Sequence, residues 1–269
     1  MEKTLKKGSW KGLFQKEWMF SKWEVLTLIL LNSAVVTLLP FGIKSAVDIP
    51  QDFSDGMSIF TGLWLVVHIF LGLKLLFTSL KGEMNRPDVW LHSPASIYQI
   101  VGVKALFAAF VNAIMLSVGG GLLGISWYLN EANRILSLTD GTLVLISILI
   151  KIFLISIVVM MTGFLFLSIY YVVRSRYRNF TALIILLLFF VGALLLEKVR
   201  ILNVFSALTD FGPVRLTNAN FYDETNHNLF SLLVPDGVIF TIGGLFVYGG
   251  ITAVLFILGA VLLEKKVRY

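Results

Sequence analysis

Long apolar runs separated by short polar segments dominate the chain. Six such runs occupy residues 24–43, 57–80, 97–128, 141–173, 180–197 and 238–263. Each run is long enough as an α-helix, at about 1.5 Å per residue, to cross about 30 Å of hydrocarbon. A backbone in lipid must satisfy its hydrogen bonds internally, so the pattern predicts an all-α integral membrane protein with six transmembrane helices.

The composition agrees with this class. Of the 269 residues, 57% are hydrophobic and 14% are charged, whereas soluble domains carry about 25% charged residues. A soluble domain of any size and a disordered chain are therefore excluded. The chain has no Cys, which excludes disulfides, thiolate metal sites and Cys nucleophiles.

Residues 1–23 differ from the apolar runs because they are basic and amphipathic. Lysines alternate there with Trp10, Phe14 and Trp18, which recur at near-helical spacing. This pattern is typical of an interfacial helix with Trp at the depth of the lipid headgroups. We expect a cytoplasmic elbow helix here, followed by a six-span domain over residues 24–269. A cleavable signal peptide is the alternative, but no A-x-A-like site follows the first apolar run.

Basic residues are sorted between alternate connections. Fourteen Lys and Arg fall on the side that holds the N-terminus, the 80–96 loop, the 174–179 loop and the C-terminal tail, and five fall on the other. The positive-inside rule then predicts a multi-pass protein of the cell membrane with both termini cytoplasmic. The net charge of +6 reflects this topology and indicates no nucleic-acid partner. The Lys-rich N-terminus should attract anionic membrane lipid.

Ionisable side chains inside apolar runs are candidates for function. Lys74 and Lys104 lie close enough to predicted cytoplasmic ends for their stems to reach the interface, so we expect both to be anchors. His68 lies near the middle of the second run, where an interhelical hydrogen bond is favoured over substrate contact or proton sensing. The three histidines lie on different segments, which disfavours a shared metal site.

Two glycine patterns bear on nucleotide binding. Gly119–Gly124 matches G-x-G-x-x-G but lies inside an apolar run, so Gly120 and Gly124 predict a close helix crossing rather than a dinucleotide site. No Gly-rich phosphate loop ending in Gly-Lys-Ser/Thr occurs. Any ATP must therefore be hydrolysed by another chain.

Two polar segments are longer than simple connections require. In the loop over residues 80–96, a short cytoplasmic helix over 88–92 would present Trp90 and Leu91 to a partner groove. A solvated hairpin with Trp90 among the headgroups is the alternative. On the external side, residues 198–237 carry two apolar patches around a polar centre, which predicts two re-entrant or interfacial helices between spans five and six.

One stretch of the loop and the following span has a distinctive order of residues. Its members are Glu83, Arg86, Trp90, Leu91, Pro94, Ser96, Gly102 and Lys104. They are similar to the E-x-x-R-x-x-x-W-L-x-x-P-x-S pattern, followed by a Gly/Lys start to span three, of small bacterial ABC-2-type permeases. The whole chain resembles permease subunits of ABC-2-type exporters in its elbow, its cytoplasmic loop and its external helices. Within that family it looks closest to compact Gram-positive permeases that export modulin peptides or confer lantibiotic immunity.

The resemblance implies a non-catalytic subunit of a dimeric transporter. A second permease, the same chain or a sister chain, would complete the transmembrane unit. A separate ATP-binding subunit would hold ATP and Mg, so this chain would carry no cofactor, metal or catalytic residue. The coupling contact with that subunit would be formed by Glu83, Arg86, Asp88, Trp90 and Leu91, and a second contact by the elbow residues Trp10, Phe14 and Trp18.

The resemblance also implies a translocation path along the second and fifth spans. The cargo would be an amphipathic peptide, an antimicrobial or a lipid-like molecule, moving past His68, Phe60, Phe77, Phe189 and Phe190. A membrane sensor or scaffold that binds peptide antibiotics through residues 198–237 without transport is the alternative function, and a membrane-bound enzyme is a third. The identity of the cargo, the direction of transport and the choice between homodimer and heterodimer stay open.

Overall fold

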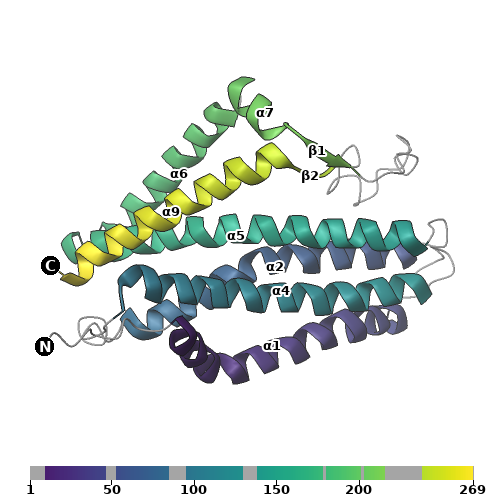
Figure 1. Ribbon diagram of the computed structural model, residues 1–269. Coiled ribbons are helices and arrows are strands. Elements are labelled where there is room, and N and C mark those ends of the chain that lie inside the picture. The colour runs from purple at the N-terminus through teal and green to yellow at the C-terminus, as the bar shows by residue number, and fades with distance from the viewer. Residues whose placement is uncertain are drawn as a thin grey trace, which may run out of the picture.

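The computed structural model describes residues 10–46, 53–84, 95–129, 138–177, 180–200, 203–215 and 238–268. Its elements are almost all helical (Figure 1). In chain order they are α1 (Trp10–Ala46), α2 (Phe53–Met84), α4 (Ile97–Leu129), α5 (Leu138–Arg176), α6 (Thr181–Arg200), α7 (Asn203–Thr209), β1 (Pro213–Arg215), β2 (Val238–Thr241) and α9 (Ile242–Arg268).

Five of the described helices, α1, α2, α4, α5 and α9, are long and apolar enough to cross a membrane. The chain is therefore an all-α, multi-pass membrane protein, as the apolar runs predicted. The second, third and fourth runs fall inside α2, α4 and α5. The fifth run forms the 20-residue helix α6, which is not among those five.

Helix α1 joins the predicted elbow and the first predicted span in one helix. Residues 13–39 contain no Gly or Pro, so nothing in this stretch ends a helix that has begun. The structure accordingly has no break after residue 23, where the sequence predicted a boundary. The first turns of α1 are nonetheless angled to the remainder of the helix (Figure 1).

The core lies between α1, α2, α4, α5 and α9. The main packing contacts join α1 to α4, α2 to α4 and α5, and α5 to α9. Side chains that are almost completely buried fill these contacts, among them Leu76, Leu80, Val101, Val111, Met115, Met160, Phe164 and Leu263. Because the runs are apolar on all sides of the helix, each helix can bury one face against its neighbours and another against lipid.

Glycines let α4 and α5 approach closely. A Cβ atom added at Gly124 would lie 2.8 Å from Leu145 Cδ2, and one added at Gly120 would collide with Leu149. The prediction that Gly120 and Gly124 mark a close helix crossing is confirmed. The G-x-G-x-x-G pattern of residues 119–124 lies entirely within α4, away from any strand.

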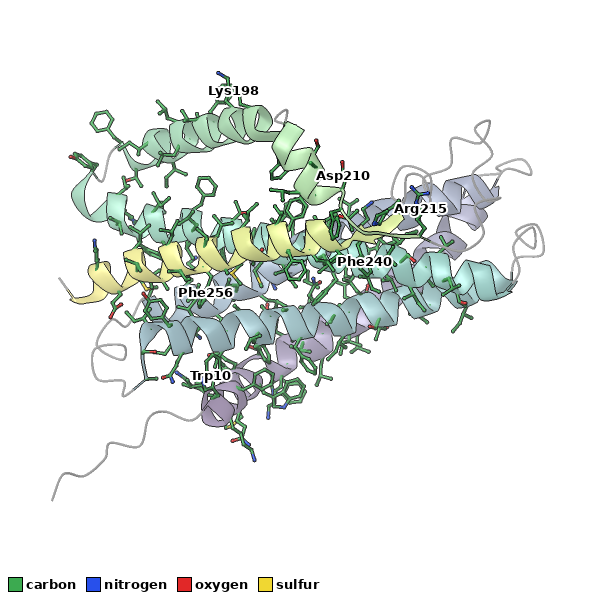
Figure 2. The ribbon with its side chains drawn as sticks, turned by 45° about the horizontal axis from the view of Figure 1, so that its top comes forward. Trp10, Lys198, Asp210, Arg215, Phe240 and Phe256 are labelled. Atoms are coloured by element: carbon green, nitrogen blue, oxygen red, sulfur yellow. The ribbon has the colours of Figure 1, made fainter. Side chains whose placement is uncertain are left out.

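Helix α6 stands away from the other helices (Figures 1 and 2). Its main packing contacts are with α5 and with α7. Large apolar side chains along α6 are exposed, including Leu186, Leu187 and Leu194. In a single chain, α6 is therefore an apolar helix with little protein around it.

The chain returns from α6 to α9 through α7 and a two-stranded antiparallel sheet. Pro213 pairs with Thr241 and Val214 with Phe240, with an irregularity before Arg215. Gly212 has a φ of 63°, a value that favours glycine at this turn into β1. The sequence predicted the helical patch that became α7 but no strand, and the second apolar patch of residues 229–234 lies outside the described residues. Re-entry of this segment into the membrane stays a prediction.

Candidate functional site

Lys104 is buried where α1, α2 and α4 meet, with only 3% of its surface exposed. Its Nζ lies 2.6 Å from Glu17 Oε1 on α1. It also lies 2.7 Å from Ser79 Oγ and 3.2 Å from Glu83 Oε1, both on α2. The prediction that Lys104 is an interfacial anchor is wrong, because α1 and α2 cover the ammonium group and supply its acceptors.

Two further contacts complete this cluster, which we call the charged junction and define as Lys16, Glu17, Ser79, Glu83 and Lys104. The Ser79 hydroxyl donates a hydrogen bond to Glu17 Oε2 at 2.6 Å. The Lys16 ammonium lies 2.8 Å from Glu83 Oε1 at the more exposed edge. Two cations thus face two carboxylates. Burial of ions is tolerated in this form, with each charge paired and hydrogen-bonded.

The charged junction stands beside both ends of the predicted coupling loop. Glu83 is the penultimate residue of α2, and Met84 alone separates it from residues 85–94. After the loop, Ser96 Oγ accepts a hydrogen bond from Gln99 N and Gln99 Oε1 accepts one from Ser96 N, which forms a capping box at the start of α4. Lys104 follows on the same helix. The helices that enter and leave the loop are therefore clamped to each other.

Of the predicted coupling residues, the structure places Glu83 in the charged junction. The other four, Arg86, Asp88, Trp90 and Leu91, lie outside the described residues. Their contact with a partner stays a prediction. Lys74, the second predicted anchor, is more exposed than Lys104 and pairs with Glu24 of α1.

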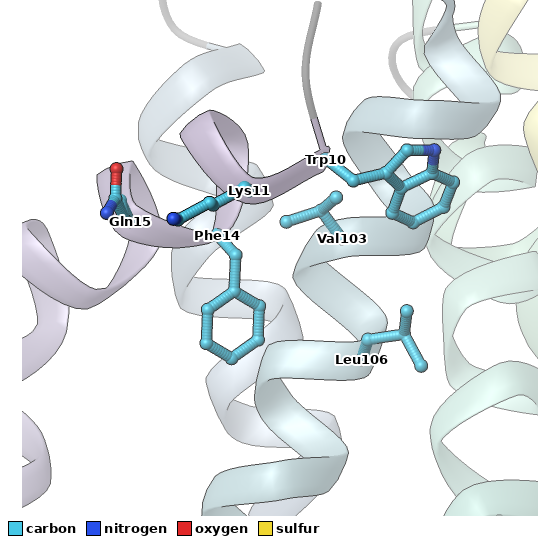
Figure 3. A pocket seen from close by; sticks show the side chains of 6 residues that line it. All are labelled: Trp10, Lys11, Phe14, Gln15, Val103 and Leu106. Atoms are coloured by element: carbon cyan, nitrogen blue, oxygen red, sulfur yellow. The ribbon is translucent and has the colours of Figure 1, made fainter.

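Two of the three elbow aromatics contact α4. The Phe14 ring meets the rings of Phe107 and Phe110 edge to face, with centroid distances of 5.4 and 6.1 Å. Trp10 lies against Gly102, where an added Cβ would be 3.1 Å from the indole Cη2. The first turns of α1 pass across α4 here (Figure 3). Trp18 is exposed, as expected of a headgroup-level Trp.

A second polar cluster lies deeper between the helices and is uncharged. Trp64 Nε1 donates to Asn32 Oδ1 at 2.8 Å, and Asn32 Nδ2 donates to the Met115 carbonyl at 2.9 Å. Gly119 leaves room for this amide, because an added Cβ would lie 3.2 Å from Asn32 Nδ2. One Asn side chain thereby links α1, α2 and α4.

His68 is buried beside this cluster, and among the described residues it makes no interhelical hydrogen bond of the predicted kind. Its Nδ1 lies 3.1 Å from the Trp64 carbonyl of its own helix, and its ring meets the Trp64 ring edge to face at 5.6 Å. Within the described part of the chain, Trp64 makes the interhelical bond instead. The histidine supports the tryptophan that reaches α1.

A third contact joins α4 to α5. Asn112 Nδ2 donates to Ser156 Oγ at 2.8 Å, and Asn112 Oδ1 is buried without a hydrogen-bond partner among the described residues. The sequence prediction missed Asn32, Asn112 and Ser156 because it searched the apolar runs for ionisable groups. The isolated Asn residues in those runs, Asn32 and Asn112, were the signal that could have revealed these contacts.

Three of the five predicted path residues have described side chains, and they lie on α2 (His68 and Phe77) and on α6 (Phe190). Phe77 on α2 is partly buried, whereas Phe190 on α6 is 65% exposed. The side chains of Phe60 and Phe189 lie outside the described residues. The main packing partners of α2 are α4 and α5, and those of α6 are α5 and α7. A path along α2 and α6 stays a prediction.

The chemistry of these clusters is ion pairing and hydrogen bonding between helices. Among the residues that the structure describes, no group of three His, Asp or Glu side chains could hold a metal ion. Comparison of the chain with known protein families, with curated proteins and with solved structures finds no match.

Proposed function

We propose that the chain is the permease subunit of an ATP-binding-cassette exporter, driven by a separate ATP-binding subunit. The observation that carries this proposal is the charged junction. It fastens the two helices that flank residues 85–94 to each other through Lys104 and Glu83, and to α1 through Glu17. Because its two flanking helices are joined, this loop can transmit a displacement caused by a partner subunit to the transmembrane helices.

Six membrane crossings fit this role, with α6 as the fifth span in chain order and α9 as the sixth. The 20 residues of α6 cover about 30 Å at the helical rise. The start of α1 and the end of α9 lie at the same end of the molecule (Figure 1), which requires an even number of crossings. With the basic loops inside, both termini are cytoplasmic.

The proposed mechanism is conformational. The ATP-binding subunit, which holds ATP and Mg, contacts Arg86, Asp88, Trp90 and Leu91. When its nucleotide state changes, the loop moves and Glu83 moves with it. Lys104 passes the displacement to α4 and, through Glu17, to the start of α1. This chain contributes positions and contacts, and no catalytic group.

A second permease completes the path in this proposal. The exposed apolar side chains of α6 and of the outer face of α2 would meet the second subunit or an amphipathic cargo. Phe77 and Phe190 lie on these two helices. An amphipathic peptide, an antimicrobial or a lipid-like molecule matches such apolar walls, which select a class of molecule rather than one compound.

The proposal is tested by purifying the tagged chain from its own membrane and measuring ATP-dependent transport with Trp90→Ala and Glu83→Arg. We expect stoichiometric co-purification of an ATP-binding subunit and loss of transport in both variants, with each variant still in the membrane. Lys81→Ala is the matched control, because Lys81 is exposed at the same end of α2 but is not a member of the charged junction.

Two outcomes would overturn the proposal. Transport retained in both variants would remove the coupling assignment. Reproducible absence of any ATP-binding subunit would favour the alternative function, a sensor or scaffold that binds peptide antibiotics without transport. Glu83→Arg adds a cation beside Lys104 and can weaken folding, so Trp90→Ala, outside the charged junction, keeps the test independent of stability.

A further inference from the structure

A cleft of about 440 Å³ lies between the first turns of α1 and the cytoplasm-proximal part of α4 (Figure 3). We call it the elbow cleft and define it by its lining residues, which are Trp10, Lys11, Phe14, Gln15, Val103 and Leu106. Its volume falls in the range of about 300–1,000 Å³ that is usual for small-molecule sites. No step of the proposed transport mechanism uses it.

The elbow cleft is apolar on one side and polar on the other. Phe14, Val103 and Leu106 supply aromatic and aliphatic surface, and Phe14 is held in place by the rings of Phe107 and Phe110. Lys11 and Gln15 lie together on the α1 side (Figure 3). A ligand that fits both sides has a hydrocarbon part and an anionic head.

Lys11, like Lys22 and Lys81 among the described lysines of α1 and α2, is exposed, and of these three it is the one that lines the cleft. Lys16, Lys74 and Lys104 each pair with a carboxylate. No carboxylate among the described residues lies within ion-pair distance of Lys11, which is exposed at the edge of the cleft. Its positive charge is therefore available to a bound anion.

The surroundings of the elbow cleft indicate where such a ligand comes from. Large apolar side chains are exposed on the two helices that form the cleft, among them Trp18, Phe20 and Trp23 on α1 and Leu106 and Phe110 on α4. In a membrane protein a surface of this kind faces lipid chains. The charged junction lies at the same end of α1 and α4, and ionised side chains in membrane proteins are tolerated best near the interface with water. The cleft thus opens at the depth of phospholipid headgroups.

We propose that the elbow cleft binds an anionic phospholipid. Its acyl chain lies on Phe14, Val103 and Leu106, and its phosphate group binds the Lys11 ammonium. The Gln15 amide supplies a further hydrogen-bond donor at the same edge. Since Trp10 and Phe14 belong to α1 and Val103 and Leu106 to α4, the lipid holds the start of α1 against α4. The proposal does not depend on the transport function.

The test uses the purified full chain, depleted of lipid in detergent and titrated with phosphatidylglycerol or phosphatidylcholine, with bound lipids counted by native mass spectrometry. We expect the wild type to bind one phosphatidylglycerol more tightly than phosphatidylcholine. Lys11→Gln should weaken phosphatidylglycerol binding about fivefold, the factor expected for one lysine at a membrane surface, and weaken phosphatidylcholine binding less, because the choline cation offsets the phosphate of that lipid. Leu106→Trp should fill the cleft and weaken both lipids.

Lys81→Gln is the matched control, because Lys81 is exposed at the same end of the molecule but does not line the cleft. Equal losses in Lys11→Gln and Lys81→Gln would overturn the proposal in favour of general surface charge. Equal wild-type affinity for the two lipids would also overturn it. Competition by soluble glycerophosphate as strong as that by the intact lipid would show a free-anion site instead. If Leu106→Trp unfolds at the same temperature as the wild type, a loss of lipid binding in this variant reflects a filled cleft rather than a loss of folding.

Discussion

Polar contacts between the helices are of two kinds that lie at different depths. The charged junction, near the end of α2 and the start of α1, buries Lys104 with two carboxylates. Deeper in the bundle, Asn32 and Asn112 make neutral hydrogen bonds to neighbouring helices. The free energy of moving a charge into hydrocarbon explains the distribution, because ions are tolerated only when paired and close to the interface.

The two kinds of contact should respond differently to substitution of their residues. Removing Lys104 from the charged junction leaves Glu17 buried without the cation that it pairs with, whereas the more exposed Lys16 can be removed because Lys104 still pairs with Glu83. Removing one amide leaves only neutral groups, which find other partners more easily. Through Lys104, the charged junction should therefore make the larger contribution to holding α1, α2 and α4 together, whereas each amide contact contributes a smaller amount.

Lys104→Met should give the largest effect. The substitution leaves Glu17 and Glu83 close together without the cation that lies between them. We expect the free energy of unfolding to fall by about 3–5 kcal/mol, measured by reversible denaturation in detergent. Lys74→Met is the control, since the Lys74–Glu24 pair has side chains that are 52% and 34% exposed and should contribute about 1 kcal/mol or less. Equal losses in the free energy of unfolding for the two variants would contradict the claim that the buried ion pair contributes more than the exposed one.

Asn32→Leu should have an intermediate effect. The change removes the acceptor for Trp64 Nε1 and the donor to the Met115 carbonyl. Since interhelical hydrogen bonds in membranes contribute about 0.6 kcal/mol on average, we expect the free energy of unfolding to fall by about 1–2 kcal/mol. Ser117→Ala is the control on α4, because the Ser117 hydroxyl donates only to the Ala113 carbonyl of its own helix. A loss as large as that of Lys104→Met would contradict the ranking.

Lys16→Gln should give the smallest effect of the three. Lys16 is 41% exposed, and Lys104 still neutralises Glu83 in its absence. The free energy of unfolding should change by about 1 kcal/mol or less in the same denaturation experiment. A much larger loss would show that Lys16, rather than Lys104, compensates the Glu83 carboxylate.

The helices could be predicted from the sequence because their signal is local. An uninterrupted apolar run has one way to satisfy its backbone in a membrane, and the ends of α4 agree with the predicted run to within one residue. The continuity of α1 could also have been predicted, because residues 13–39 contain no Gly or Pro. The prediction of a boundary at residue 23 followed the change in composition, which does not end a helix.

The charged junction could not be predicted because its partners are distant in the sequence. Glu17 and Lys104 are 87 residues apart, and only the packing of α1 on α4 brings them together. Without that packing, a lysine two turns from a helix end is expected to extend to the interface. The pairing of β1 with β2 depends on tertiary contacts in the same way, since 22 residues separate the two strands. A search for isolated amides in the apolar runs would have found Asn32 and Asn112.

A double-mutant cycle between Glu17 and Lys104 tests the central claim, that the buried ion pair of Lys104 joins α4 to α1. The free energies of unfolding of Glu17→Gln, Lys104→Met and the double variant are compared with that of the wild type. We predict that the double variant loses about 2–3 kcal/mol less than the sum of the two single variants, because the second change removes the carboxylate that the first left unpaired. Losses that add to within about 0.5 kcal/mol would contradict the account.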